Sequence, residues 1–316
     1  MSVNDALAYP TPFALYPYLP YTDRPKLHWP SGARIAFWVA PNIEFYEMYP
    51  PTNPVRPAWF RPEPDTHNYS WRDQSSRVGV WRMMEVLARH GVRASVSTSV
   101  AVMDHYPEVI EAGTALGWEW FSHGIYNTRA IFGLSSEQER EIIRDSARTI
   151  LAHTGQKLAG WLGPSLSVSN TITDNLAAEG LEYTLDFFHD DQPTPLRVRE
   201  GRLISIPYSW VVNDALMFHV WGASPSEYLD TLKRQFDRLY AEGARNPTVM
   251  GVPLHPYLIG QAHRIGALDE LLSYVTSHEG VWLPTAREIA AYYYEHHYDR
   301  VVAAHGTAWE MHDAGA

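Results

Sequence analysis

Short apolar runs alternate with longer amphipathic segments along most of the chain. Residues 33–45 and 248–255 are rich in β-branched and aromatic side chains, a composition typical of buried strands. Residues 78–91 repeat apolar side chains at helical intervals and end at Gly91, which favours a helix that stops at this glycine. The same patterns predict further strands over 92–99, 118–124, 159–163 and 183–188, and further helices over 106–117, 136–153, 170–180, 266–278 and 285–297.

Two helix starts carry capping pairs. Ser136 is followed three residues later by Glu139, and Ser224 is followed three residues later by Glu227. Strands that alternate with helices favour a parallel sheet, and six or seven such units in about 260 residues favour a (β/α) barrel, closed or incomplete. The predicted fold is therefore α/β, with the barrel over residues 33–298.

Three segments interrupt this pattern. Residues 1–32 are rich in Pro and Tyr, and we expect an extended arm there, because proline disrupts helix interiors. Residues 49–74 include another Pro-rich stretch, and residues 299–316 follow the last predicted helix as a tail. Because 49–74 follows the carboxyl end of a strand, where barrel active sites gather, we interpret it as a loop that forms a site wall or a subunit contact.

Composition narrows the possible partners. The 316 residues include 25 Lys and Arg against 36 Asp and Glu, for a formal net charge of -11, without a basic run. This balance argues against nucleic acid or an anionic membrane surface and favours a small substrate. The chain has no cysteine, and therefore no disulfide, thiolate zinc site or thiol nucleophile. No apolar run approaches the roughly 18 residues of a membrane span, and the first residues lack a signal-peptide pattern, so we expect a cytoplasmic protein.

Polar and aromatic side chains follow the predicted strands at their carboxyl ends. Parallel strands end at the same edge of a barrel, so these side chains are expected to meet on one face. One histidine at a strand end is more often structural than catalytic, but several such groups together favour an active site. In chain order, the candidates are Asn42, Glu44, His123, Asn127, Trp161, Pro164, Asp190, Asp191, Asn213, Asp214, His255 and Arg264.

Six blocks of sequence, in this order and spacing, resemble one known family. They are PNIEFYE from residue 41, FSHGIYNTR from 121, GWLGPSLS from 160, DFFHDDQPTP from 186, IPYSWVVND from 206 and LHPYLIGQAHRI from 254. They resemble the polysaccharide deacetylase (NodB-homology) superfamily and, within it, the branch near the metal-independent allantoinases and cyclic-imide hydrolases. The resemblance implies a distorted (β/α) barrel of about seven parallel strands that hydrolyses carbon–nitrogen bonds in non-peptide amides.

The same resemblance implies a poor metal site. Metal-dependent members place two neighbouring Asp residues after the first strand and an H-x-x-x-H pair later, whereas the matching positions here carry Glu44, Phe45, His123 and Asn127. Phe has no donor atom, and a neutral amide oxygen is a weak ligand for zinc. We therefore expect no cofactor. If a divalent metal such as zinc is bound, its ligands would be Glu44, His123 and Asn127, or a rearranged set that includes His255.

Hydrolysis of an amide without a metal needs a base, an acid and a donor to the developing oxyanion. We assign the base to Glu44, because the aromatic residues around it in sequence would desolvate the carboxylate and raise its pKa. An ion pair with an arginine is the alternative for Glu44. His255 matches the late catalytic histidine of the superfamily and is the expected acid, or else a packed structural histidine. His123 and Asn127 are expected to donate to a substrate carbonyl.

The other candidates are expected to bind the substrate. Each of them also fits a structural role, as a turn residue, a helix start or a surface charge. As pocket residues, they divide into an apolar wall, hydrogen-bonding groups for ring atoms, and one cation for a carboxylate. The wall is Trp161 and Pro164, the hydrogen-bonding groups are Asn42, Asp190, Asp191, Asn213 and Asp214, and the cation is Arg264.

Three functions of different class stay open. The leading one is a hydrolase of a cyclic amide, imide or ureide, because ring strain and a good leaving nitrogen reduce the need for a Lewis acid. The second is a divalent-metal-dependent deacetylase of a polysaccharide or N-acetyl sugar, and the third is a barrel that binds a small ligand without catalysis. The Pro- and Tyr-rich arm and loop favour a homodimer or homotetramer.

Overall fold

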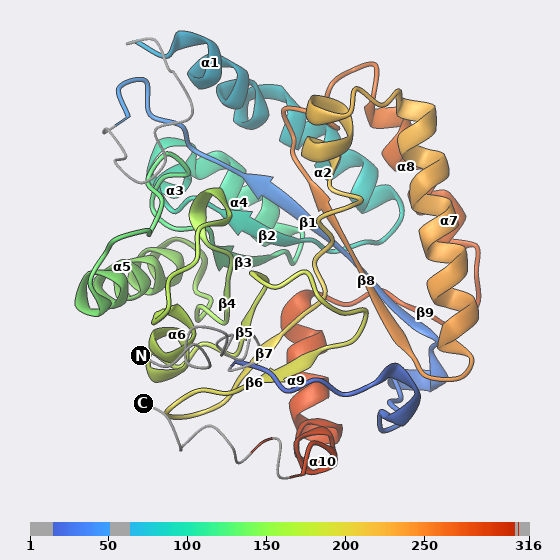
Figure 1. The fold of residues 1–316 in the computed structure, drawn as a ribbon. Helices are drawn as coiled ribbons and strands as arrows, with labels where there is room; N and C mark the ends of the chain where they lie inside the picture. Colours follow the sequence, from blue (N-terminus) through green and yellow to red (C-terminus); the bar gives the residue numbers. More distant parts are fainter. Residues whose placement is uncertain (1–14, 51–63, 307–308, 310–316) are drawn as a thin grey trace, which may run out of the picture.

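A nine-stranded sheet organises the computed structural model, which describes residues 15–50, 64–306 and 309 (Figure 1). The strand order is β6-β7-β5-β4-β3-β2-β1-β8. The short strand β9 lies outside this order and pairs with the start of β1. All pairs are parallel except β6 with β7, and the curled sheet forms a half-barrel. The strands are β1 (Ile35–Ile43), β2 (Ser95–Thr98), β3 (Glu119–Ser122), β4 (Gly160–Trp161), β5 (Tyr183–Thr184), β6 (Thr194–Leu196), β7 (Leu203–Ser205), β8 (Thr248–Leu254) and β9 (Val281–Trp282).

Helices pack around this sheet. The longest are α5 and α7, and α7 packs against both β8 and α8. No helix of the described residues is both long enough and apolar enough to cross a membrane. The helices are α1 (Thr66–Gln74), α2 (Val80–Arg89), α3 (Ala101–His105), α4 (Pro107–Ala115), α5 (Ser136–Thr154), α6 (Ile172–Ala178), α7 (Pro225–Gly243), α8 (Ile265–Thr276), α9 (Ala286–His296) and α10 (Tyr298–Ala304).

The α/β half-barrel confirms the predicted fold class, with a slightly different number of strands. About seven parallel strands were expected, whereas the sheet has nine and one antiparallel pair. Several strands, among them β6 and β9, are only two or three residues long, which is too short for a period-2 pattern to emerge. The long strand β1 is buried along its whole length, as its continuous apolar run predicted.

One capping pair is confirmed and the other is shifted by one residue. Ser224 and Glu227 form the predicted capping box of α7. For α5 the prediction of Ser136 is wrong, because Ser135 has the extended backbone of an N-cap and pairs with Gln138. The Ser136 hydroxyl donates instead to the side chain of Asn175.

The segment predicted as a loop over 49–74 is helical from Thr66 onward, where α1 begins. The Asp65 carboxylate accepts a hydrogen bond from the backbone N–H of Asn68 and so caps α1. Parts of three predicted segments lie outside the described residues, namely 1–14 of the arm, 51–63 of the loop, and 307–308 with 310–316 of the tail. Figure 1 shows α1 beyond the carboxyl end of β1.

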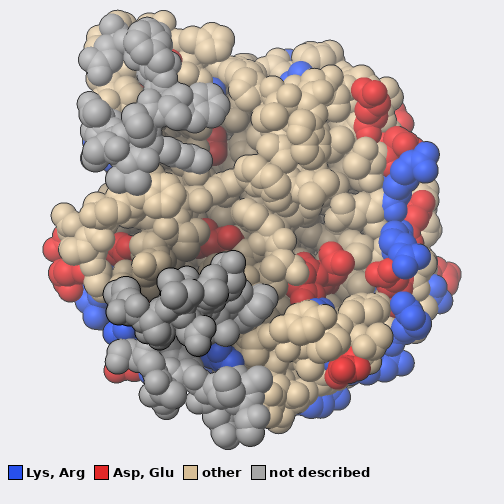
Figure 2. Space-filling model, viewed as in Figure 1, with Lys and Arg blue, Asp and Glu red and all other residues tan. Residues whose placement is uncertain are grey.

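Charged side chains on the face seen in Figure 2 are distributed unevenly. Lys and Arg lie mainly along one edge, over α7, together with Asp and Glu. Two of these arginines form ion pairs one helical turn away, Arg234 with Asp230 and Arg238 with Glu242. These two arginines of α7 are therefore paired with carboxylates of the same helix.

Candidate functional site

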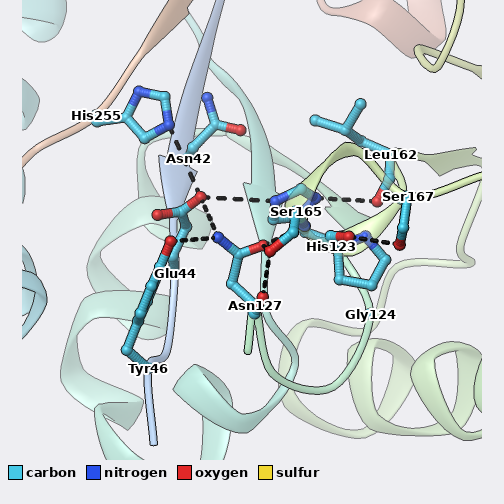
Figure 3. A network of polar contacts seen from close by, with 12 residues as sticks. Asn42, Glu44, Tyr46, His123, Gly124, Asn127, Leu162, Ser165, Ser167 and His255 are labelled. Atoms are coloured by element: carbon cyan, nitrogen blue, oxygen red, sulfur yellow. Dashed lines mark hydrogen bonds and ion pairs between the residues drawn. The ribbon is translucent and has the colours of Figure 1, made fainter. Parts of the chain in front are cut away.

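Three candidate residues meet where parallel strands end. Glu44 follows β1, His123 follows β3 and His255 follows β8, and all three side chains are buried. The Nε2 atom of His123 lies 3.6 Å from Oε1 of Glu44, and Nε2 of His255 lies 3.7 Å from the same oxygen. Figure 3 shows the two imidazole rings approaching the carboxylate from different sides. The fold thus brings together a carboxylate and two imidazoles that are far apart in the sequence.

The two oxygens of Glu44 differ in their contacts. Oε1 accepts a hydrogen bond of 2.7 Å from the side-chain amide of Asn127. Oε2 is buried and has no hydrogen-bond partner among the described residues. A buried carboxylate oxygen without a donor is costly, so it marks a position for water or a ligand.

Asn127 has no group left for a substrate. Its amide nitrogen donates to both Glu44 and the hydroxyl of Tyr46, and its oxygen accepts from the backbone N–H of Ser165 (Figure 3). The predicted donation from Asn127 to a substrate carbonyl therefore does not fit this geometry. Asn127 instead fixes the orientation of the Glu44 carboxylate.

His123 is held by a backbone carbonyl. Its Nδ1 donates to the carbonyl oxygen of Leu162 over 3.0 Å, so its Nε2 faces Glu44. With Nδ1 as the donor, Nε2 carries a proton only when the ring is cationic. The predicted role of His123 as a donor to a substrate oxygen therefore requires the imidazolium form.

Asp214 orients His255. One oxygen of Asp214 accepts from the backbone N–H of His255 at 2.7 Å, and the other accepts from its Nδ1 at 2.6 Å. The Asp214 side chain is completely buried, which corrects its predicted contact with substrate. Burial alone would lower the pKa of His255, but the charge and hydrogen bond of Asp214, with the charge of Glu44, raise it. His255 is therefore suited to carry a proton near neutral pH.

The pKa of Glu44 moves opposite to the prediction. Burial raises it, as expected for a desolvated carboxylate, but the close polar contact with His123 and the charges of His255, His123 and Arg72 outweigh burial. The net result is a lowered pKa. The sequence indicated the burial of Glu44, but it gave no sign that cations would surround the carboxylate.

Three further candidates lie near this cluster in structural roles. The Asn42 amide donates to the hydroxyl of Tyr208 and to the carbonyl oxygen of Leu254, which ties β1 to β8. Trp161, predicted as part of an apolar pocket wall, is fully buried in the hydrophobic core. The side-chain oxygen of Asn213 accepts from the backbone N–H of Ala215, a local turn contact.

Pro164 packs against the residue after His123. Gly124 has a φ of +72°, and a Cβ atom there would lie 2.8 Å from Cγ of Pro164. We expect Gly124→Ala to lower the free energy of unfolding by about 2–4 kcal/mol, from backbone strain plus overpacking, and to displace His123. Gly91→Ala is the matched control, because Gly91 has a φ of +65° and open space around its Cβ position. Chemical denaturation should find a smaller loss for Gly91→Ala; equal losses would contradict the role of Pro164.

Asp190 and Asp191 do not join the cluster. Asp190 pairs with Arg24 at 2.6 Å, and the carbonyl oxygen of Asp191 accepts from the backbone N–H of Val249 at the start of β8. Six residues of extended strand separate Val249 from His255, roughly 20 Å. The Arg264 guanidinium lies over the ring of Phe218, 4.3 Å from its centre. The prediction that all strand-end residues share one face is thus wrong for the two aspartates.

Two residues near the cluster were missed at the level of sequence. Arg72 contacts the rings of Tyr46 and Tyr257. It lies on α1, within the segment that the sequence predicts as a loop. The capping residue Asp65 is the sequence signal that indicates a helix start there. Asp186 accepts from the backbone N–H of Gly163 and from the hydroxyl of Thr184, and burial raises its pKa to about 6. No sequence pattern indicated the burial of this aspartate.

The donor set does not fit zinc. No group of three or more His, Cys, Asp or Glu in the described parts of the chain has the geometry to hold a metal ion. Phe45 stacks on His105 and offers no donor atom, and the amide of Asn127 turns its hydrogens toward Glu44. An amide nitrogen in this orientation has no lone pair for a cation. The ligand set Glu44, His123 and Asn127 is therefore unsuited to zinc.

Known proteins resemble the chain over most of its length. No family model matches the sequence. A Schizosaccharomyces pombe protein named as a polysaccharide deacetylase is 27% identical over 291 residues, which cover 83% of this chain and 91% of that protein. A Helicobacter pylori peptidoglycan deacetylase is 22% identical over 249 residues, or 68% of this chain and 84% of that protein.

Two solved structures extend the comparison. A Pseudomonas aeruginosa protein described as a polysaccharide deacetylase matches with a TM-score of 0.77 and 29% identity, over 86% of this chain and 95% of that chain. The PuuE allantoinase matches with a TM-score of 0.76 and 28% identity, over 86% of this chain and 94% of that chain. In sequence and in fold, the chain is thus similar to the polysaccharide deacetylases and to an allantoinase, which confirms the resemblance that its six motifs indicated.

Proposed function

We propose that the protein hydrolyses a carbon–nitrogen bond in a cyclic amide, imide or ureide, with Glu44 as the base and His255 as the acid. The names of its relatives support hydrolysis of a carbon–nitrogen bond. The observation that carries the proposal is the buried oxygen Oε2 of Glu44, which has no hydrogen-bond partner among the described residues and belongs to a carboxylate flanked by two imidazoles. This arrangement supplies a proton acceptor and a proton donor close to each other.

Glu44 would act first, by taking a proton from the attacking water. Its lowered pKa keeps the carboxylate ionised at neutral pH, and the hydrogen bond from Asn127 to Oε1 leaves Oε2 to accept the proton. A carboxylate with a low pKa is only a modest base. The substrate therefore needs a reactive carbonyl and a good leaving nitrogen, which cyclic imides and ureides provide and a plain N-acetyl amide does not.

His255 would complete the reaction by protonating the leaving nitrogen. Because Asp214 accepts from Nδ1, the proton on Nε2 is the one available for transfer. The raised pKa of His255 keeps this proton in place until the carbon–nitrogen bond breaks. His123, in its imidazolium form, is the proposed donor to the developing oxyanion.

A second candidate is a metal-dependent deacetylase of a polysaccharide or N-acetyl sugar. Its support is the word deacetylase in the names of three relatives. The donor set argues against it, because Asn127 and Phe45 stand where the resemblance places metal ligands.

Chelation separates the two candidates. We expect hydantoin, allantoin, succinimide or phthalimide to be turned over by the purified protein, at a rate that EDTA leaves unchanged, because no step uses a cation. Elemental analysis of the same preparation gives its metal content. Stoichiometric zinc, loss of activity with EDTA and deacetylation of N-acetylglucosamine oligomers would establish the second candidate instead. No turnover across the whole panel would point to a barrel that binds a ligand without catalysis.

A further inference from the structure

Arg72 places a cation beside the proposed catalytic pair. Its guanidinium carbon lies 4.2 Å from the ring centre of Tyr46 and 4.6 Å from that of Tyr257. Tyr46 follows Glu44 by two residues, and Tyr257 follows His255 by two residues. The arginine therefore contacts both of the loops that carry the proposed base and acid, and the ring faces favour a positive charge at this position.

The Arg72 guanidinium forms no ion pair with a carboxylate of the described residues. Arg72 has no Asp or Glu within ion-pair distance in the described part of the chain, and its Nη1 donates to the neutral side-chain oxygen of Asn68 at 2.7 Å. Its Nε–H is buried and donates to no described acceptor. Leaving a charged donor buried without an acceptor is expensive, and proteins usually satisfy such groups. The position is thus prepared for an acceptor that the described residues do not supply.

The charge of Arg72 shifts the pKa values of several groups in the site. It lowers the pKa of Glu44, opposes the rise in the pKa of His255 and contributes to the lowered pKa of His219. An anion bound at Arg72 would therefore lie close to the reacting atoms. Such an anion would also compensate the positive charge of Arg72 at the moment when Glu44 becomes neutral by taking a proton.

We propose that Arg72 binds a carboxylate carried by the substrate, so that the preferred substrates are cyclic amides, imides or ureides with an anionic substituent next to the ring. The proposal rests on the function proposed above and narrows its substrate class. A guanidinium matches a carboxylate geometrically as well as electrostatically, because its planar N–H groups donate to both oxygens. A neutral ring would leave the buried Nε–H without a partner.

The competing explanation is that Arg72 only keeps Glu44 ionised. The two explanations differ in what changes when Arg72 is replaced. If Arg72 binds the substrate, KM rises for anionic substrates and not for neutral ones. If Arg72 only acts on Glu44, the acidic limb of the pH–rate profile moves to higher pH for every substrate, because the pKa of Glu44 rises when the cation is lost.

The experiment compares hydantoin with hydantoin-5-acetic acid, which adds a carboxylate to the same ring. For Arg72→Met we expect kcat/KM to fall by about 10- to 100-fold for the acid, mainly through KM, and to change little for hydantoin. Arg72→Lys keeps the charge but loses the planar donor array, and should recover part of the loss. Arg77→Met is the control, because Arg77 is exposed and its ion pair is with Asp73 rather than with Glu44 or His255. Equal losses for both substrates would overturn the proposal.

A binding measurement separates this proposal from the proposed function. Calorimetry measures the affinity for hydantoin-5-acetic acid of two variants, Glu44→Gln and the double variant Glu44→Gln, Arg72→Met. This measurement of binding does not depend on turnover. Binding that depends on Arg72 supports the proposal, even if no compound in the panel is hydrolysed. Binding that is equal in the two variants, or absent from both, overturns it.

Discussion

Glu44→Gln is expected to reduce kcat by about 10²- to 10⁴-fold on any cyclic imide or ureide that the protein hydrolyses. Gln has nearly the same shape and can still accept from Asn127 through its oxygen. Its amide nitrogen replaces the free oxygen Oε2, however, and cannot take a proton from water. Steady-state kinetics at neutral pH measures the effect, and KM should change much less than kcat, because the lost interaction belongs to the transition state.

Glu47→Gln is the matched control for this variant. Glu47 lies three residues further along the same segment, and its carboxylate accepts from Thr128 and pairs with Arg129. The same chemical change at Glu47 should leave kcat almost unaffected. A Glu44→Gln variant that is folded by thermal denaturation and retains the wild-type rate would remove Glu44 from the mechanism.

Asp214→Asn is expected to reduce kcat/KM by about 10²- to 10⁴-fold at pH 8, although Asp214 has no contact with the solvent. If the new asparagine accepts from the backbone N–H of His255 through its oxygen, its amide hydrogens face Nδ1 of the ring. Nδ1 must then accept a hydrogen bond, which favours the tautomer without a proton on Nδ1. The variant also lacks the charge that raises the pKa of His255, so the imidazolium is lost at lower pH.

The pH–rate profile tests this explanation directly. Activity needs His255 protonated, so kcat/KM falls as the pH rises through the pKa of His255. In the wild type this pKa is raised, and the alkaline limb lies above the ordinary range of histidine; in Asp214→Asn the limb should move to lower pH. A uniform loss of rate without movement of the limb would reduce Asp214 to a structural role.

Asp190→Asn is the control for Asp214→Asn. The sequence placed both aspartates in the substrate pocket, but Asp190 pairs with Arg24 near the start of β8. We expect Asp190→Asn to keep the wild-type kcat/KM and the wild-type pH profile. A large effect on KM would mean that the substrate extends well beyond the cluster.

The order of strands and helices was readable from the sequence because it depends on local periodicity. The continuous apolar run of β1 and the cap of α7 are properties of neighbouring residues, and both are confirmed. The meeting of Glu44, His123 and His255 followed from the same pattern, because parallel strands carry whatever follows them to one edge. The six motifs added the resemblance to deacetylases and an allantoinase.

Tertiary structure decided the chemistry of this edge. Several contacts join residues that are distant in the sequence. Asp214 pairs with His255, Arg72 of α1 contacts Tyr46, and Asn127 accepts from the backbone N–H of Ser165. The sign of the Glu44 pKa shift depends on these contacts, because charges a few ångströms away outweigh burial. The sequence by itself therefore indicated that Glu44, His123 and His255 gather at the ends of the strands. Only the folded chain determined which of the predicted residues join them, which carry protons and which hold the others in place.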